Sequence, residues 1–196
     1  MEKINFIKTF IPQGDFREKY EHGGMMVRHL AAVLDEKMGA YECYECTVPI
    51  GEYDEGEIQK AFAEFSAKMD ALKLKQAKVD KISEIAAYDT SSSVNGFVLN
   101  GLLVWLDKAT RVGLMNSTTI AKAAGQQTTT LWLGDVKLEV DCDKAIQLLS
   151  ALEMYALECF NVTAAHKAAV TDLKTIKEVE AFDVTADYPK QLEMKL

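Results

Sequence analysis

The chain has 196 residues, of which 48% are hydrophobic and 27% are charged, the composition of an ordinary globular protein. Its formal net charge of −8 argues against nucleic-acid phosphate as the main partner, because phosphate binding needs clustered lysine and arginine. No run reaches the roughly 18 apolar residues of a membrane helix, and the first residues lack the pattern of a signal peptide. We therefore expect a protein that is made in the cytoplasm and binds neither nucleic acid nor membrane.

Residues 1–53 are predicted to form a small N-terminal β-hairpin region. In "MMVRHLAAVLDEKMGAYECYECTV" two extended runs flank the polar turn "DEKMG", and the second run alternates as a half-exposed strand does. The first run also fits a helical period, and we favour the hairpin. The preceding "GDFREKYEHGG" is predicted to be a short helix that ends at Gly23 and Gly24.

Residues 54–88 carry the strongest helical signal of the chain. Apolar side chains repeat at alternating spacings of four and three, which is a heptad seam. A helix of about 34 residues would be roughly 50 Å long, more than a small domain covers. Two alternatives stay open: the seam forms a coiled coil between copies of the chain, with a homotrimer favoured, or it packs against the rest of the same chain. The seam consists of Ile58, Phe62, Phe65, Met69, Leu72 and Val79, with Gln76 at one polar position.

Residues 89–196 are predicted to form an α+β domain. Asn100 and Gly101 lie between two apolar runs, the strongest short signal for a hairpin with a type I′ turn. A second hairpin turns at Gly134 and Asp135, and a capped helix follows each hairpin. The first helix is capped by Asp107, and the second by Asp141 or Asp143.

The second of these helices has one apolar stripe about 30 residues long, from Ala145 to Leu173. Thr175 and Glu178 then form a capping box for a last short helix. The predicted fold class is therefore α+β: two β-hairpins with helices packed on one face, preceded by a long amphipathic helix and a small N-terminal β region.

The chain has four cysteines and three histidines, residue types that can bind zinc. A zinc site needs four ligands, and the Cys43-x-x-Cys46 pair has no second pair at ligand spacing. Both cysteines are expected at ordinary strand positions, and His166 is expected to be a core histidine with a hydrogen-bond partner. We expect no metal, no cofactor and no catalytic residue.

Trp105 and Trp132 occupy matching places in the two predicted hairpins. Buried tryptophans anchor cores or subunit interfaces, because each ring buries a large apolar area. Exposed tryptophans can instead stack on a sugar or a base. We favour the first alternative, in which both residues are domain anchors or part of an interface.

The C-terminal half has a recognisable order of motifs. It runs from "SVNGFVLNGLLVWLDKATRVGLMNS" through the Trp132 hairpin and the capped helix to "EVEAFDVTADYP". This stretch, residues 90–190, resembles a domain of unknown function that recurs in tailed bacteriophages and prophages. The elements that carry the resemblance are Phe97 to Gly101, Asp107 to Arg111, Trp132, Asp141 to Val170, and Val179 to Pro189.

The resemblance implies no catalytic residues. Such domains are similar to parts of phage tail, fibre or baseplate-associated proteins. The expected role is a structural protein of the virion tail, made in the bacterial host, that acts as an oligomeric adaptor or cap. Its expected partners are copies of itself and other phage structural proteins.

Two other functions stay open. One is a tail-fibre assembly chaperone that is not retained in the virion. The other is a small metal- or redox-dependent enzyme that uses Cys43, Cys46 and a histidine.

Overall fold

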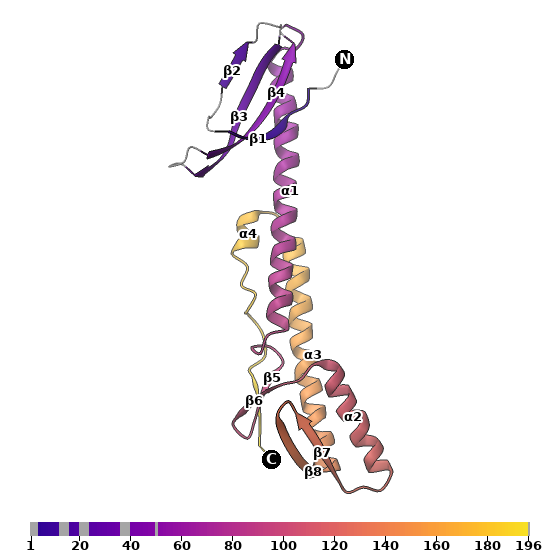
Figure 1. Ribbon diagram of the computed structural model, residues 1–196. Helices are drawn as coiled ribbons and strands as arrows, with labels where there is room; N and C mark the ends of the chain where they lie inside the picture. Colours follow the sequence, from indigo (N-terminus) through magenta and orange to yellow (C-terminus); the bar gives the residue numbers. More distant parts are fainter. Residues whose placement is uncertain (1–3, 12–15, 20–23, 36–39, 50, 196) are drawn as a thin grey trace. The chain divides into compact units, whose positions relative to one another are not determined.

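The computed structural model describes residues 4–11, 16–19, 24–35, 40–49 and 51–195. The chain divides into two compact units, Met1–Lys73 (unit 1) and Leu74–Leu196 (unit 2). The division falls inside one continuous helix, α1 (Glu55–Asp89) (Figure 1). Among the described residues, no helix combines the length and the apolar content needed to span a bilayer.

Unit 1 contains a four-stranded antiparallel sheet with the strand order β1-β4-β3-β2. The strands are β1 (Ile7–Ile11), β2 (Phe16–Lys19), β3 (Gly24–Asp35) and β4 (Ala40–Pro49). The pairing of β3 with β4 confirms the predicted hairpin, whose turn lies outside the described residues.

The predicted short helix before this hairpin is wrong. Residues Phe16 to Lys19 form β2, which pairs with Met25 to Arg28 of β3. A charged four-residue segment has only a weak local preference, so pairing with a neighbouring strand decides its conformation. The predicted helix end at Gly23 lies outside the described residues.

Helix α1 confirms the predicted long helix. It begins at a reciprocal cap, because Asp54 Oδ1 accepts from Glu57 N at 2.8 Å and Glu57 Oε2 accepts from Asp54 N at 2.9 Å. The only glycine in α1 is Gly56 in its first turn, and no proline interrupts it.

The first half of α1 packs on the sheet of unit 1. Tyr44 meets Phe65 edge-on, with ring centroids 5.1 Å apart, and Phe6 lies 5.5 Å from Phe62. Such tilted aromatic pairs are favoured arrangements. The buried residues of this core are Phe6, Val27, Tyr44, Cys46, Val48 and Ile58.

Unit 2 has the predicted α+β organisation, with hairpin sheets and helices packed together (Figure 1). The first hairpin pairs β5 (Gly96–Leu99) with β6 (Leu102–Trp105), and the second pairs β7 (Thr128–Leu133) with β8 (Val136–Asp141). The helices are the second half of α1, α2 (Lys108–Ala123), α3 (Cys142–Asp172) and the short α4 (Ile176–Glu180).

A final strand, β9 (Leu192–Met194), pairs in parallel with β5 and makes the sheet order β6-β5-β9. No sequence pattern predicted this strand. The C-terminal segment thus returns to the first hairpin after α4.

The local signals for turns and caps are confirmed. Asn100 (φ 51°) and Gly101 (φ 86°) both have the positive φ that a type I′ turn requires. Asp107 accepts from Thr110 N at the start of α2, and Asp141 accepts from Asp143 N and Lys144 N at the start of α3. The capping box of α4 is also present.

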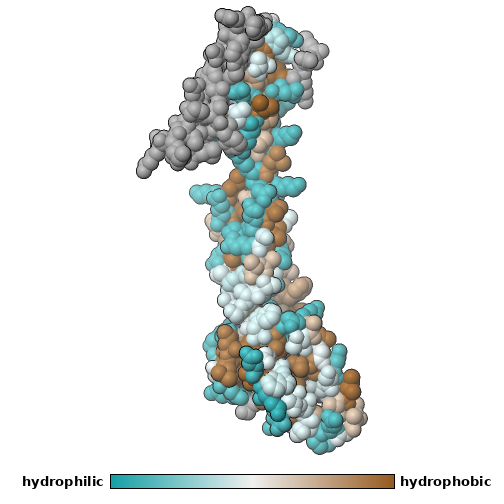
Figure 2. All heavy atoms as spheres, viewed as in Figure 1, coloured by the Kyte–Doolittle hydropathy of each residue, from teal (hydrophilic) through white to brown (hydrophobic). Residues whose placement is uncertain are grey.

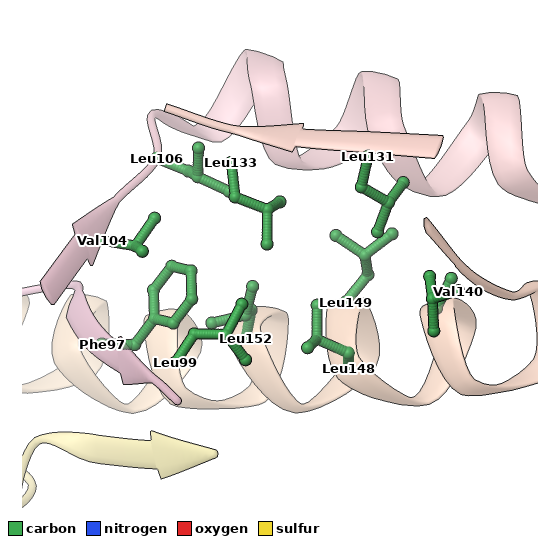
Figure 3. Close-up of a cluster of buried hydrophobic side chains, with 11 residues drawn as sticks. Phe97, Leu99, Val104, Leu106, Leu131, Leu133, Val140, Leu148, Leu149 and Leu152 are labelled. Carbon is green, nitrogen blue, oxygen red and sulfur yellow. The ribbon is translucent and has the colours of Figure 1, made fainter. Parts of the chain in front are cut away.

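The main core of unit 2 lies between α3 and both hairpins (Figure 3). Its side chains come from β5, β6, β7, β8 and the buried stripe of α3. The predicted α3 stripe is confirmed from Ala145 to Val170, and Leu173 is partly buried. The largest side chains of this core are Phe97, Leu99, Leu106, Leu131, Leu133, Leu148, Leu149 and Leu152.

Candidate functional site

The predicted seam on α1 divides into two groups. Ile58 is 1% exposed, and Phe62, Phe65 and Met69 are partly buried against the core of unit 1. Leu72 and Val79, at 50% and 53% exposed, lie outside the core clusters. Four of the six seam residues thus pack within the chain, and self-association through this helix stays a prediction.

A buried carboxylate ties α1 to the sheet of unit 1. Lys8 Nζ lies 2.7 Å from Glu42 Oε2, and Lys73 Nζ lies 2.8 Å from Glu42 Oε1. Burial acts to raise the pKa of Glu42, but the hydrogen bonds from Lys73 and Lys8 outweigh it and lower that pKa. The hydrogen bond to Glu42 raises the pKa of Lys73. The two ion pairs therefore link β1 and α1 to β4 within unit 1.

The two tryptophans lie at the surface of unit 2. Trp105 on β6 is 42% exposed, and Trp132 on β7 is 57% exposed. Neither belongs to the buried core, so they do not anchor it. Their role at an interface stays a prediction.

The cysteine pair lies in the interior of unit 1. Cys43 and Cys46 are buried on β4, and neither forms a disulfide. In the part of the chain that the structure describes, no group of three or more His, Cys, Asp or Glu side chains is placed to hold a metal.

His166 is buried on α3, as predicted. Its ring meets Phe182 at 5.3 Å and Tyr188 at 5.5 Å, both edge-on. The expected hydrogen-bond partner is missing at one nitrogen, since Nδ1 has no partner among the described residues. His166 therefore packs between the rings of two residues from the C-terminal segment.

A hydrogen-bonded chain holds the C-terminal segment against α1 and α3. Thr163 Oγ1 donates to Asp89 Oδ1 at 2.7 Å and lies 2.7 Å from Tyr188 Oη. A hydroxyl has one proton to donate, so Tyr188 is the donor to Thr163. Burial raises the pKa of Tyr188, and its donor role requires the protonated phenol. These contacts fix the segment that leads to β9.

A groove of about 450 Å³ opens beside Trp105 on unit 2. Leu157 and Phe160 of α3 line it together with Trp105, and Phe160 is 63% exposed. The polar lining includes Asp107 and Lys108. The groove therefore presents three large apolar side chains within a polar surround, and Figure 2 shows exposed apolar residues on unit 2.

Arg111 is one of the residues that line this groove. Its Nε donates to Glu153 Oε1 at 2.8 Å, and its Nη1 donates to the Leu106 carbonyl oxygen at 2.6 Å. The Arg111 side chain is largely buried, and it links the end of β6 to α3. These two hydrogen bonds hold the Arg111 side chain in place beside the apolar lining residues.

Leu103, Leu157 and Phe160 are exposed, and no sequence pattern had predicted this exposure. A signal for the last two was available, because they fall outside the buried stripe of α3 although they are large and apolar. Such positions on a helix normally carry polar side chains.

Of the comparisons with known proteins, one gives a match, and the matched residues lie within unit 2. No curated protein and no solved structure gives a match to the chain. Residues 76–186 match a family described as Domain of unknown function (DUF4376). This match spans more than half of the 196 residues. The chain therefore belongs to the DUF4376 family.

Proposed function

We propose that the chain is a structural protein of a tailed bacteriophage or prophage, from the tail, fibre or baseplate region of the virion. In this role it is an oligomeric adaptor or cap that contacts copies of itself and other phage structural proteins, and it catalyses no reaction. The proposal is supported by the resemblance of residues 90–190 to a phage-associated domain.

The observation that carries an adaptor role is the apolar groove of unit 2. Trp105, Leu157 and Phe160 line one surface groove and are each 42–63% exposed. Grouped apolar side chains with a polar rim are typical of surfaces that bind other proteins. Tryptophan is also enriched among the residues that dominate binding energy.

The construction of the chain also suits an adaptor. Unit 1 and unit 2 each have their own buried core, and helix α1 is common to both. A chain with two such units offers separate surfaces to two different partners.

Mass spectrometry of purified virions tests the proposal. Particles from a phage that encodes this chain should contain abundant peptides from both units. A chain that is present in the infected cell but absent from finished particles would contradict the virion role. That result would favour an assembly chaperone, since an open apolar groove also suits transient binding of a fibre protein.

A further inference from the structure

Strand β6 lies at the open edge of its sheet. The strand order is β6-β5-β9, so β5 covers one side of β6 and no strand of the described chain covers the other. A free edge presents unpaired N–H and C=O groups to any strand that approaches it. The pairing of the hairpin shows which groups of β6 are free.

The turn between β5 and β6 determines which residues of β6 form hydrogen bonds with β5. Asn100 and Gly101 form a two-residue loop, so the flanking residues Leu99 and Leu102 are a hydrogen-bonded pair. The backbone groups of Leu102 therefore point toward β5.

Bonded and non-bonded pairs alternate along an antiparallel ladder. Val104 therefore also bonds to β5, whereas the N–H and C=O groups of Leu103 and Trp105 point to the free edge. On the other side of the sheet, Asn100 N donates to Met194 O at 3.0 Å, as this alternation requires.

The free edge lacks the usual protection against strand pairing. Natural edges carry lysine, proline or a bulge, but β6 reads Leu-Leu-Val-Trp and pairs regularly with β5. Leu102 and Leu103 are 56% and 59% exposed. An apolar, uncharged edge of this kind is a template for a further strand.

We propose that β6 pairs with β6 of a second copy of this chain. In an antiparallel register centred on Val104, Leu103 faces the partner's Trp105, and Trp105 faces the partner's Leu103. Each of these two pairs exchanges both backbone hydrogen bonds, so the outward groups of both strands are satisfied together. The inference rests on the self-association in the proposed function, but not on the phage setting.

Self-complementarity favours a second copy over another occupant. The register places an aliphatic side chain opposite an aromatic one twice, and such cross-strand pairs are favourable. Since β6 carries no charge, pairing brings no like charges together within the two strands. A two-fold contact of this kind is also closed, as most homo-oligomer contacts are.

The exposed area indicates a reversible dimer. Fully buried aromatic side chains cover about 150–250 Å² each, and Trp105 is only 42% exposed. A stable specific interface buries about 800 Å² per partner, more than a four-residue strand supplies. The dimer should therefore dissociate on dilution. Each copy has a formal net charge of −8. Added salt should therefore screen the repulsion between the two copies and strengthen the dimer.

Sedimentation velocity and amide hydrogen exchange of the full chain test this contact. As concentration rises, a dimer should form and the Leu103 and Trp105 amides should exchange more slowly. The Leu102 and Val104 amides, which already bond to β5, should not change. A chain that stays monomeric, or a dimer that leaves the Leu103 and Trp105 amides unprotected, would overturn the proposal without touching the virion assignment.

Leu103→Lys is the matched variant, because lysine protects natural edges and the side chain is already exposed. It should raise the dimer dissociation constant about tenfold or more. Ile120→Lys on α2 is the control, since it makes the same charge change at a residue that is 69% exposed and lies off the sheet. Equal weakening by both variants would mean that charge alone acts, and would reject the β6 contact.

Discussion

The β5–β6 and β7–β8 hairpins each place a tryptophan in a short strand, yet the free edges of β6 and β8 carry different side chains. Strand β8 exposes Lys137 and Glu139, which lie on the same face of the strand. Strand β6 exposes only apolar side chains. Charged side chains discourage pairing at an edge, so the β8 edge is protected and the β6 edge is open.

The second difference between the hairpins is the support that each receives. A third strand, β9, extends the first hairpin, and Arg111 ties the end of β6 to α3. The second hairpin stays two-stranded. Because these contacts hold β6 in place, the strand should need little ordering before it binds. This reduces the entropic cost of association.

The largest effect should come from the core that both hairpins share. Leu149 of α3 is fully buried in this core (Figure 3). Leu149→Ala should lower the unfolding free energy of unit 2 by about 2–5 kcal/mol, through lost apolar contacts and a cavity. Leu157→Ala on the same helix is the control, because its side chain is half exposed. Equal losses in chemical denaturation would mean that Leu149 is not the shared centre.

Removal of the Arg111 side chain should affect the first hairpin and spare the second. Arg111→Met leaves Glu153 and the Leu106 carbonyl without their donor, which should cost about 1.5–3 kcal/mol in denaturant unfolding. On the second hairpin, Lys137 pairs with Glu139 at 3.6 Å on the surface, and Lys137→Met should change stability by less than about 0.5 kcal/mol. A larger effect of the Lys137 variant would reverse this ranking.

The attachment of β9 should depend on Tyr188. Tyr188→Phe removes the donor to Thr163 and should cost about 1 kcal/mol. Amide exchange of Asn100, which donates to Met194 O of β9, should then become faster. Trp132→Phe on the second hairpin should leave that amide unchanged. If exchange at Asn100 is unaffected by Tyr188→Phe, the C-terminal segment is held by other contacts.

The smallest effect should be a pH dependence at the helix that follows the first hairpin. The side-chain and backbone hydrogen bonds from Thr110 lower the pKa of Asp107 below its usual value of 3.8. A lowered pKa in the folded state stabilises the fold at pH values above 3.8, and this contribution is lost as the pH falls through the lowered pKa.

Asp107→Asn retains a capping side chain that does not titrate. In thermal melts the wild-type chain should therefore lose more stability than this variant as the pH falls below the usual aspartate pKa. Identical acid profiles would show that Asp107 does not contribute to the pH dependence.

Several elements of unit 2 were predictable because their signals are local. The positive φ angles at Asn100 and Gly101 follow from residue type. The caps at Asp107 and Asp141 satisfy amide groups only a few residues away. The buried stripe of α3 follows from the period of its apolar residues.

The sequence by itself determined the order of the long helix, the hairpins and the capped helices, since each depends on neighbouring residues. Only the tertiary structure decided the pairings between distant segments: Phe16 to Lys19 became a strand by pairing with β3, and Leu192 to Met194 became one by pairing with β5. The same holds for the seam, because apolar periodicity marks a face to be covered but does not name the surface that covers it. In unit 1 that surface is a sheet of the same chain.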